Sequence, residues 1–308
     1  MPSKILVTGG AGFIGTHLCR ALADEHEVHV LDLKDPRSAV KGVKYRIGDA
    51  RDPGTLAEMT RDAACVYHLA AYVSVPYCQE HPGESYENNL VASVRVGEAA
   101  LAESKRTGRK VRVIFSSSAA VYSRAGIEGK GLRESDVSSV PLSFYGAQKL
   151  GSEHALKVYR DLSGLPVVNF RFFNVYGPGQ DPKSPYSGVI SLFTGAVREN
   201  RGLTLNGDGR QTRDFVFVRD LTDALSRASR IPEEACDGNA VNLGTGRSIS
   251  ILDLAEETMK AAGKTVPVKH GPPRAGDVRH SCSDISRARD VLGWEPRVTL
   301  AEGLRELR

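Results

Sequence analysis

Short apolar runs alternate with segments of helical periodicity through the first half of the chain. An apolar run at residues 4–8 leads through a glycine-rich turn into apolar positions that recur every three or four residues from Phe13 to Leu22, which predicts a strand followed by a helix. This alternation continues and predicts an α/β fold, a doubly wound parallel sheet. Further strands are predicted at residues 27–31, 43–47, 66–69, 111–115 and 166–170, and a long helix at residues 84–104.

The composition indicates a globular protein with a small-molecule partner. Of the 308 residues, 41% are hydrophobic and 25% are charged, and the net charge is +4. No run of like charges concentrates the positive excess, so we expect no nucleic-acid groove, whereas a diffuse positive balance suits an anionic small molecule. The N-terminal apolar run is too short for a signal sequence or a membrane span, so we expect a cytoplasmic protein with no membrane partner.

The cysteines are far apart in the sequence and form no C-x-x-C pair. This spacing is typical of reduced thiols, and we expect neither a disulfide framework nor a metal site. The five cysteines are Cys19, Cys65, Cys78, Cys236 and Cys282.

The glycine-rich turn after the first strand has the spacing of a dinucleotide-binding loop. Gly9 permits a tight turn, Gly12 lets a pyrophosphate approach the backbone, and Gly15 lets the helix pack closely on the strand. The helix, which opens with Phe13 and Ile14, would present free N–H groups and its positive dipole end to the phosphates. Strand, glycine turn and helix together predict a Rossmann domain that binds a dinucleotide.

Acidic residues after the next two strands favour NAD as the cofactor. Asp32 ends the second strand, 20 residues after Gly12, where a carboxylate can accept both ribose hydroxyls of the adenosine and would repel the 2′-phosphate of NADP. Lys34 and Arg37 lie close by and keep NADP as an alternative. After the third strand, the carboxylate of Asp49 could meet the adenine amine.

The ends of the fourth and fifth strands offer further candidates. Small residues at positions 70–71 would let a cofactor lie against the backbone, whereas His68 stands among apolar residues and is interpreted as a core residue without chemistry. The fifth strand brings three serines, residues 116–118, to the carboxyl edge of the sheet. Ligands bind at that edge in doubly wound sheets.

Tyr145 and Lys149 stand four residues apart in a segment expected to open a helix, so both lie on one helical face. The ordinary pKa of a tyrosine is ~10, and a neighbouring ammonium is expected to lower that pKa by favouring the phenolate. A hydroxyl from residues 116–118 can face the phenol across a substrate. We interpret the pair as a tunable base, the alternative being a surface tyrosine beside a solvated lysine.

These segments occur together in one known family. Residues 8–15, Asp32, and residues 48–49, 68–71, 116–122 and 145–149 resemble an extended short-chain dehydrogenase/reductase, and most closely the nucleotide-sugar 4-epimerases of the UDP-galactose and UDP-N-acetylglucosamine type. The resemblance implies catalysis by Ser118, Tyr145 and Lys149. It also implies that NAD is held by Gly9, Gly12, Phe13, Ile14, Gly15, Asp32, Asp49, Ala50, Leu69, Ala70, Ala71, Ser116, Tyr145, Lys149 and Phe172.

The resemblance continues through the second half of the chain and implies a UDP-sugar site. Asn174 would hold the diphosphate together with Arg213 and Arg274, because a planar guanidinium binds phosphate oxygens in pairs. Asp277 would bind the uridine ribose. Ser281 stands where a tyrosine in the family crowds out a 2-acetamido group, so N-acetylated UDP-hexoses should fit. The implied substrate residues are Ser118, Asn174, Val189, Arg213, Arg274, Asp277 and Ser281.

We expect two lobes. Residues 1–175 would form the NAD-binding Rossmann domain, and residues 176–308 mainly a smaller α/β substrate-binding lobe for the UDP-sugar, because glycine and proline begin to interrupt the pattern there. Segments within about residues 210–250 would return to the first domain. Members of the family usually form homodimers through two helices per subunit, here the helix at residues 84–104 and the one that starts at Tyr145.

The implied reaction is NAD-dependent 4-epimerisation of a UDP-hexose, either UDP-GlcNAc/UDP-GalNAc or UDP-Glc/UDP-Gal, through a transient 4-keto sugar. UDP-glucuronate 4-epimerase, 4,6-dehydratase and reductase are alternatives. Dehydratases place an acidic pair directly after the active-site serine, whereas this chain has Ala119 and Ala120, and reductases generally favour NADPH, which Asp32 disfavours. An NAD-binding sensor without catalysis would be expected to have lost Ser118, Tyr145 or Lys149, which are all present.

Overall fold

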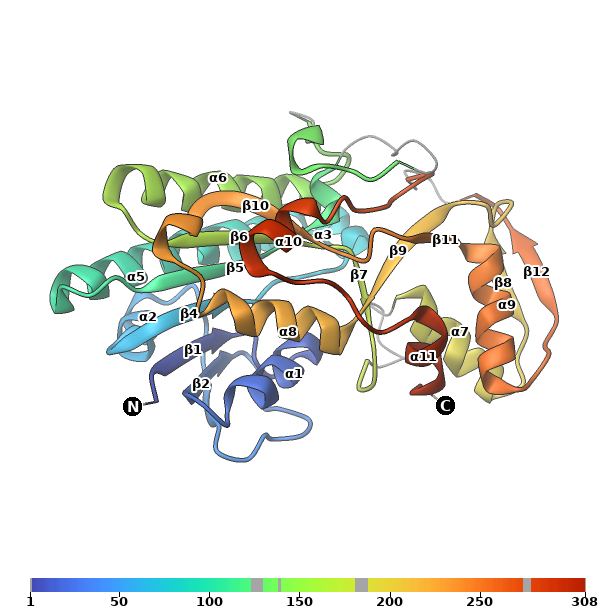
Figure 1. Cartoon of the computed structure of the whole chain (residues 1–308), viewed down its shortest axis with the longest axis horizontal. Helices are drawn as coiled ribbons and strands as arrows, with labels where there is room; N and C mark the ends of the chain where they lie inside the picture. Colours follow the sequence, from blue (N-terminus) through green and yellow to red (C-terminus); the bar gives the residue numbers. More distant parts are fainter. Residues whose placement is uncertain (1, 123–129, 138–139, 181–187, 274–277, 308) are drawn as a thin grey trace. The chain divides into compact units, whose positions relative to one another are not determined.

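The computed structural model describes residues 2–122, 130–137, 140–180, 188–273 and 278–307 (Figure 1). The chain forms two compact units, and each is assembled from segments that are distant in the sequence. The first unit comprises Met1–Val121, Ser139–Arg171 and Thr222–Val241, and the second comprises Tyr122–Ser138, Phe172–Leu221 and Asn242–Arg308.

These bounds differ from the expected ones in three places. The first change of unit falls at residues 121–122, because residues 122–138 belong to the second unit. The main boundary lies at residues 171–172, at the end of strand β6 (Val167–Phe172), and not at residue 175. The segment that returns to the first unit is residues 222–241, shorter than the expected 210–250.

The first unit is built on a seven-stranded sheet in the order β10-β6-β5-β4-β1-β2-β3. The pairs β3–β2, β2–β1, β1–β4 and β4–β5 are parallel, which confirms the predicted doubly wound sheet. The order reverses direction between β1 and β4, and that crossover is where ligands bind in such sheets. The strands are β1 (Lys4–Thr8), β2 (Glu27–Asp32), β3 (Lys44–Ile47), β4 (Ala63–His68), β5 (Arg112–Ser118), β6 and β10 (Asp237–Leu243).

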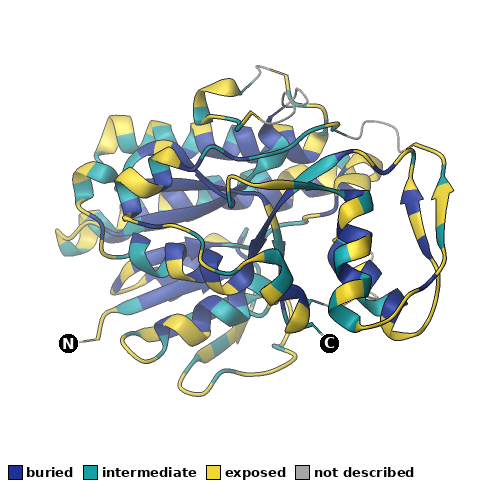
Figure 2. Ribbon diagram, turned by 45° about the vertical axis from the view of Figure 1, so that its right-hand side comes forward, coloured by how far each residue is buried: buried dark blue, intermediate teal, exposed yellow. Residues whose placement is uncertain are grey.

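Helices cover both faces of this sheet. Side chains from α2, α5 and α6 pack with alternate residues of the strands in one apolar core, while Tyr67 points to the opposite face and donates to the carbonyl oxygen of Leu225 in α8 at 2.8 Å. Figure 2 shows the buried strands between helices with exposed outer faces. The helices are α1 (Phe13–Leu22), α2 (Pro53–Thr60), α3 (Val75–Glu80), α4 (Pro82–Tyr86), α5 (Ala92–Thr107), α6 (Phe144–Ser163) and α8 (Val218–Ala228).

Local sequence fixes the ends of the helices that matter for function. Helix α6 begins because the Ser143 side chain caps it, accepting from the Gly146 N–H at 3.1 Å, and it ends at Gly164, whose φ of 67° is left-handed. The helix predicted at residues 84–104 is helical from α4 through α5, with a π-helical turn at Glu87–Val91 between them.

The second unit has its own core and two small sheets. In one sheet β9 lies between β7 and β11, and in the other β12 pairs with β8. Helices α7, α9 and α11 contribute to the apolar core of this unit. The elements are β7 (Asn174–Tyr176), α7 (Val189–Arg198), β8 (Leu203–Asn206), β9 (Thr212–Phe217), β11 (Ser248–Ser250), α9 (Ile251–Ala262), β12 (Val268–Gly271), α10 (Ser286–Leu292) and α11 (Leu300–Arg305).

The five cysteines are free thiols, and all except Cys282 are buried. Within the described ranges, no helix is both long and apolar enough to cross a membrane. The same residues contain no group of three or more His, Cys, Asp or Glu side chains that could hold a metal ion.

Candidate active site

The glycine loop between β1 and α1 is shaped by contacts that admit no side chain. Gly9 has a left-handed φ of 74°, and a Cβ atom there would lie 2.6 Å from the Ala70 backbone nitrogen. A Cβ atom on Gly15 would lie 2.4 Å from the Gly9 carbonyl oxygen. The loop therefore packs directly on the start of α1, as the spacing predicts, and also on the backbone after β4, which the spacing did not predict.

The open side of the loop fits a dinucleotide. A Cβ atom on Gly12 would have the Gly9 carbonyl oxygen at 3.3 Å as its one neighbour within 4 Å among the described residues, and α1 begins at the next residue. Asp32 holds the loop in place, since its Oδ2 accepts from the Ala11 N–H at 3.0 Å while its Oδ1 accepts from the Lys34 N–H at 3.2 Å. Free backbone space and a helix N-terminus suit a pyrophosphate.

Two other expected cofactor residues follow β3. Asp49 forms a charged pair with Arg51, whose Nη2 lies 2.7 Å from its Oδ2 and whose backbone N–H donates to its Oδ1 at 2.8 Å. These bonds lower the pKa of Asp49 and keep it ionised. Ala50 is buried. The adenine contact of Asp49 stays a prediction.

The turn after β4 lies against the glycine loop. The Leu69 N–H donates to the Thr8 carbonyl oxygen at 3.0 Å. His68 is fully buried between the Thr8 hydroxyl at 2.7 Å and the Ser93 hydroxyl at 3.1 Å, and burial lowers its pKa to about 3. His68 is thus a neutral core residue, as predicted, and the residues that follow it, Ala70 and Ala71, are half-buried.

The three expected catalytic residues meet at the carboxyl end of β5. Tyr145 and Lys149 lie on α6, 7% and 2% exposed, and the Ser118 hydroxyl is near enough to Tyr145 to lower its pKa. The Lys149 Nζ donates to the Ser116 carbonyl oxygen at 2.7 Å and lies 5.9 Å from the centre of the Tyr145 ring. A hydroxyl, a phenol and an amine are therefore brought together from segments about 30 residues apart in the sequence.

The predicted lowering of the tyrosine pKa by its lysine neighbour is wrong for this structure. Burial raises the pKa of Tyr145 to about 12, and the hydrogen bond from Ser118 only partly opposes that change. Burial also lowers the pKa of Lys149 to about 7. The reason is that both groups are desolvated, and the Lys149 amine is directed to the Ser116 carbonyl oxygen.

Two further expected cofactor residues lie at strand ends. The Ser116 hydroxyl donates to the His68 carbonyl oxygen at 2.9 Å, so its side chain joins β5 to β4. Phe172 is the last residue of β6 and is 9% exposed. Their contacts with a cofactor stay predictions.

The second unit contains a cavity of about 620 Å³ beside α7. It is lined by Asn174, Val189 and Arg213, three of the predicted substrate residues. Arg213 donates to the carbonyl oxygen of Thr212 at 2.7 Å. Polar residues that the sequence analysis did not select also line it, and they are Thr204, Asn206, Gln211, Glu199 and Arg201. A cavity of this size with an arginine and several amides suits a nucleotide diphosphate.

Ser281, another predicted substrate residue, is not among the described residues that line this cavity. Ser281 is half-buried, and its N–H donates to the Thr212 carbonyl oxygen at 3.2 Å, next to Arg213 in the sequence. Arg274 and Asp277 lie outside the described residues.

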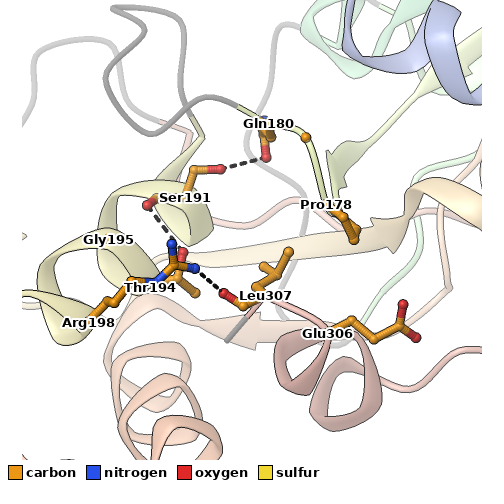
Figure 3. Close-up of a pocket in the computed structure, with 10 residues that line it drawn as sticks. Pro178, Gln180, Ser191, Thr194, Gly195, Arg198, Glu306 and Leu307 are labelled. Carbon is orange, nitrogen blue, oxygen red and sulfur yellow. Dashed lines mark hydrogen bonds between the residues drawn. The ribbon is translucent and has the colours of Figure 1, made fainter. Parts of the chain in front are cut away.

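A smaller cavity of about 240 Å³ lies on another side of α7 (Figure 3). Two hydrogen bonds join polar groups that line it: the Ser191 hydroxyl donates to the Gln180 Oε1 at 2.7 Å, and the Arg198 Nη2 donates to the Leu307 carbonyl oxygen at 2.5 Å. We assign it no function.

A buried charged group that was not predicted from the sequence lies on α6, the helix that carries Tyr145 and Lys149. Glu153 on α6 accepts from Ser117 and pairs with Arg171 on β6. Its position four residues after Lys149 was the available signal, since residues at that spacing share a helical face.

The parallel sheet, the glycine loop and the group of Ser118, Tyr145 and Lys149 define a short-chain dehydrogenase/reductase of the extended type. The model of the NAD dependent epimerase/dehydratase family matches residues 5–244. The chain belongs to this family, and its cofactor is NAD.

Individual relatives agree with this assignment. The UDP-glucose 4-epimerase of Mycolicibacterium smegmatis is 38% identical over 98% of this chain and 96% of its own length. The solved structure of the Thermotoga maritima UDP-glucose 4-epimerase with UDP-glucose matches with a TM-score of 0.91 at 31% identity, covering 99% of this chain and 97% of that one. A UDP-N-acetylglucosamine 4-epimerase from Methanobrevibacter ruminantium, in complex with UDP-N-acetylmuramic acid, matches with a TM-score of 0.87 at 34% identity, covering 100% and 97%.

Proposed function

We propose that this protein interconverts the C4 epimers of a UDP-hexose through a transient 4-keto sugar. The observation that carries the proposal is the grouping of Ser118, at the end of β5, with Tyr145 and Lys149, which share one face of α6 and of which Lys149 donates to the Ser116 carbonyl oxygen. The arginine-containing cavity of the second unit supports a substrate that is bound through its nucleotide diphosphate. The relatives described above are named as 4-epimerases of UDP-sugars, which supports the same reaction.

In the proposed reaction, the Tyr145 oxygen takes the proton of the sugar 4-hydroxyl as the C4–H bond breaks, and a C4 carbonyl forms. Bound NAD would supply the hydride acceptor and donor for C4, and its positively charged nicotinamide ring would favour the tyrosine phenolate. Ser118 donates a hydrogen bond to the same substrate oxygen and steadies its negative charge. Return of the proton from Tyr145 to the carbonyl oxygen completes the alcohol, inverted at C4 when the opposite face of the sugar is reduced.

Lys149 and the loop residues would hold the cofactor. The Lys149 amine uses one donor on the Ser116 carbonyl oxygen and has others for a ribose hydroxyl. Gly9, Gly12 and the N-terminus of α1 would hold the pyrophosphate, and Asp32 the adenosine ribose.

The residues after Ser118 favour epimerisation over dehydration. Ala119 and Ala120 form a 3₁₀ turn with Val121 directly after the active-site serine. Neither alanine can move a proton, so elimination of the C6 hydroxyl would lack its acid and base. Asp32 disfavours an NADPH-dependent reductase. UDP-glucuronate remains an alternative substrate.

We further propose that N-acetylated UDP-hexoses are accepted, because Ser281 is small. A Ser281→Tyr variant should lose activity on UDP-GlcNAc while its activity on UDP-glucose changes less than threefold. Equal loss on both sugars would show that Ser281 does not select the 2-substituent.

The test of the reaction is to incubate the protein and NAD with UDP-glucose, UDP-GlcNAc and UDP-glucuronate in separate samples, and to follow the C4 epimers by NMR. We expect the equatorial and axial 4-hydroxyl forms to equilibrate for at least one sugar. If none of the three gives a C4 epimer, the proposed function is wrong.

We also propose a homodimer that uses α5 and α6. Val158 and Leu162 on α6 are 53% and 82% exposed, and exposed apolar residues on one helix favour association. A Leu162→Glu variant should elute as a monomer in size-exclusion chromatography with light scattering, and a wild-type monomer would contradict the proposal.

A further inference from the structure

Three consecutive serines end β5, and each hydroxyl has a different partner. The Ser116 hydroxyl donates to a carbonyl oxygen of strand β4 at 2.9 Å, whereas the Ser118 Oγ accepts from the Ala120 N–H at 3.1 Å and lowers the pKa of Tyr145. The hydroxyl of Ser117 instead donates to the Glu153 carboxylate on α6. Ser117 is 2% exposed, so water does not compete for this bond. The strand end that carries Ser118 is thereby joined to the helix that carries Tyr145.

The same carboxylate is held from the other side by Arg171 on β6. The Arg171 Nε donates to the Glu153 Oε1 at 2.9 Å and its Nη2 donates to Oε2 at 2.7 Å. The two residues are 5% and 4% exposed. Removing two charges from water costs about as much as their attraction returns, so such a pair is a weak source of stability. Paired bonds to both carboxylate oxygens do, however, fix the carboxylate in one orientation.

Glu153 also shares a helical face with the catalytic residues. It lies four residues after Lys149 and eight after Tyr145 on α6, so the three side chains succeed one another along the helix. The negative charge of Glu153 raises the pKa of Lys149 against the effect of burial. A change in this carboxylate would therefore reach the catalytic residues by two routes, through Ser117 and through Lys149.

We propose that Ser117, Glu153 and Arg171 form a positioning clamp that fixes the end of β5 against α6 and so sets the position of the Ser118 hydroxyl relative to Tyr145. The inference rests on the proposed function and adds three residues that touch neither substrate nor cofactor. Loss of the clamp should weaken the interaction between the Ser118 hydroxyl and Tyr145 without removing any group that binds a ligand.

The first test replaces Ser117 with alanine, which removes one hydroxyl and leaves the pair of Glu153 and Arg171 in place. With UDP-glucose and saturating NAD, the kcat should fall ~10-fold, the effect of a small misplacement of a reacting group, while KM changes less than twofold. Ser117→Thr retains the hydroxyl and should restore kcat to within about threefold of wild type. The matched control is Ser152→Ala, a buried serine whose hydroxyl bonds to backbone carbonyl oxygens of residues 89 and 148.

The second test measures the ionisation of Tyr145 directly. The ultraviolet difference spectrum against Tyr145→Phe, recorded with saturating NAD as a function of pH, reports the phenolate. Because the bond from Ser118 lowers the Tyr145 pKa, Ser117→Ala should move this ionisation to higher pH, whereas Ser152→Ala should not.

The outcomes separate the clamp from the proposed function. If Ser117→Ala and Ser152→Ala have the same kcat, or if the Tyr145 ionisation is identical in wild type and Ser117→Ala, the clamp is refuted. A wild-type protein that epimerises no UDP-sugar would refute the proposed function, and the ultraviolet titration would still decide whether Ser117 positions Ser118.

Discussion

A single methyl group at Gly15 tests whether the loop after β1 is built around a cofactor. In Gly15→Ala the new Cβ would lie 2.4 Å from the Gly9 carbonyl oxygen, and 2.6 Å and 2.8 Å from the Gly10 Cα and carbonyl carbon. All three neighbours are backbone atoms, and carbon contacts are optimal at ~3.5–4.0 Å. The loop and the helix must therefore separate by ~1 Å, and overpacking of this kind costs ~1–3 kcal/mol.

The displacement falls on the part of the loop that would hold the pyrophosphate. Shifts of ~1 Å in a binding geometry cost ~100-fold, so the Kd for NAD should rise by about that factor, or ~2.8 kcal/mol. The assay is isothermal titration of the cofactor-free protein with NAD, together with the thermal midpoint Tm.

The matched control is Gly54→Ala. Gly54 also lies in the first turn of a helix, α2, but a Cβ there would have its nearest neighbour, Asp52 Oδ2, at an ordinary 3.5 Å. Alanine should stabilise that position by ~0.4–1 kcal/mol through the unfolded chain and leave the Kd for NAD unchanged. If Gly15→Ala binds NAD as tightly as Gly54→Ala, the loop does not form the phosphate site and the reasoning is refuted.

Three further predictions concern the chemistry. Tyr145→Phe should abolish turnover while the Kd for NAD stays within threefold, and residual epimerisation seen by NMR would identify another base. Arg213→Met should raise the KM for UDP-glucose ~10-fold or more by removing a phosphate partner, whereas Arg210→Met, an exposed neighbour outside the cavity, should not. The pKa of Lys149 is lowered to about 7, against ~10.4 in the unfolded chain. Between these values the unfolded state binds more protons, so the free-energy cost of burying this lysine is fully present below pH ~7 and is lost as the pH rises. In urea unfolding, Lys149→Met should have a higher free energy of unfolding than wild type, and this difference should shrink by up to ~1.4 kcal/mol per pH unit above pH 7. A difference in the free energy of unfolding that does not change with pH would contradict the lowered pKa of Lys149.

The sequence by itself determined the features that depend on neighbours along the chain. The glycine loop, the acid after β2 and the helical pair of Tyr145 and Lys149 each occupy a short segment, and the backbone geometry of a strand, a turn or a helix fixes how residues within such a segment face one another. The predicted sheet and the predicted cofactor, NAD, are confirmed because the patterns that indicate them each lie within about 20 residues of sequence. The catalytic roles stay a prediction.

Tertiary structure alone decided the features that depend on what surrounds a side chain. The burial of Tyr145 reversed the expected direction of its pKa, since desolvation by residues from several elements outweighs one neighbour on its own helix. Residues 130–137 belong to the second unit through contacts that no local pattern encodes, such as the hydrogen bond from the Leu132 N–H to the Cys282 carbonyl oxygen. The carboxylate of Glu153 accepts a hydrogen bond from Ser117, 36 residues earlier in the chain, because α6 packs on the sheet and brings the two groups together. Polar groups in such a low-dielectric interior must be paired.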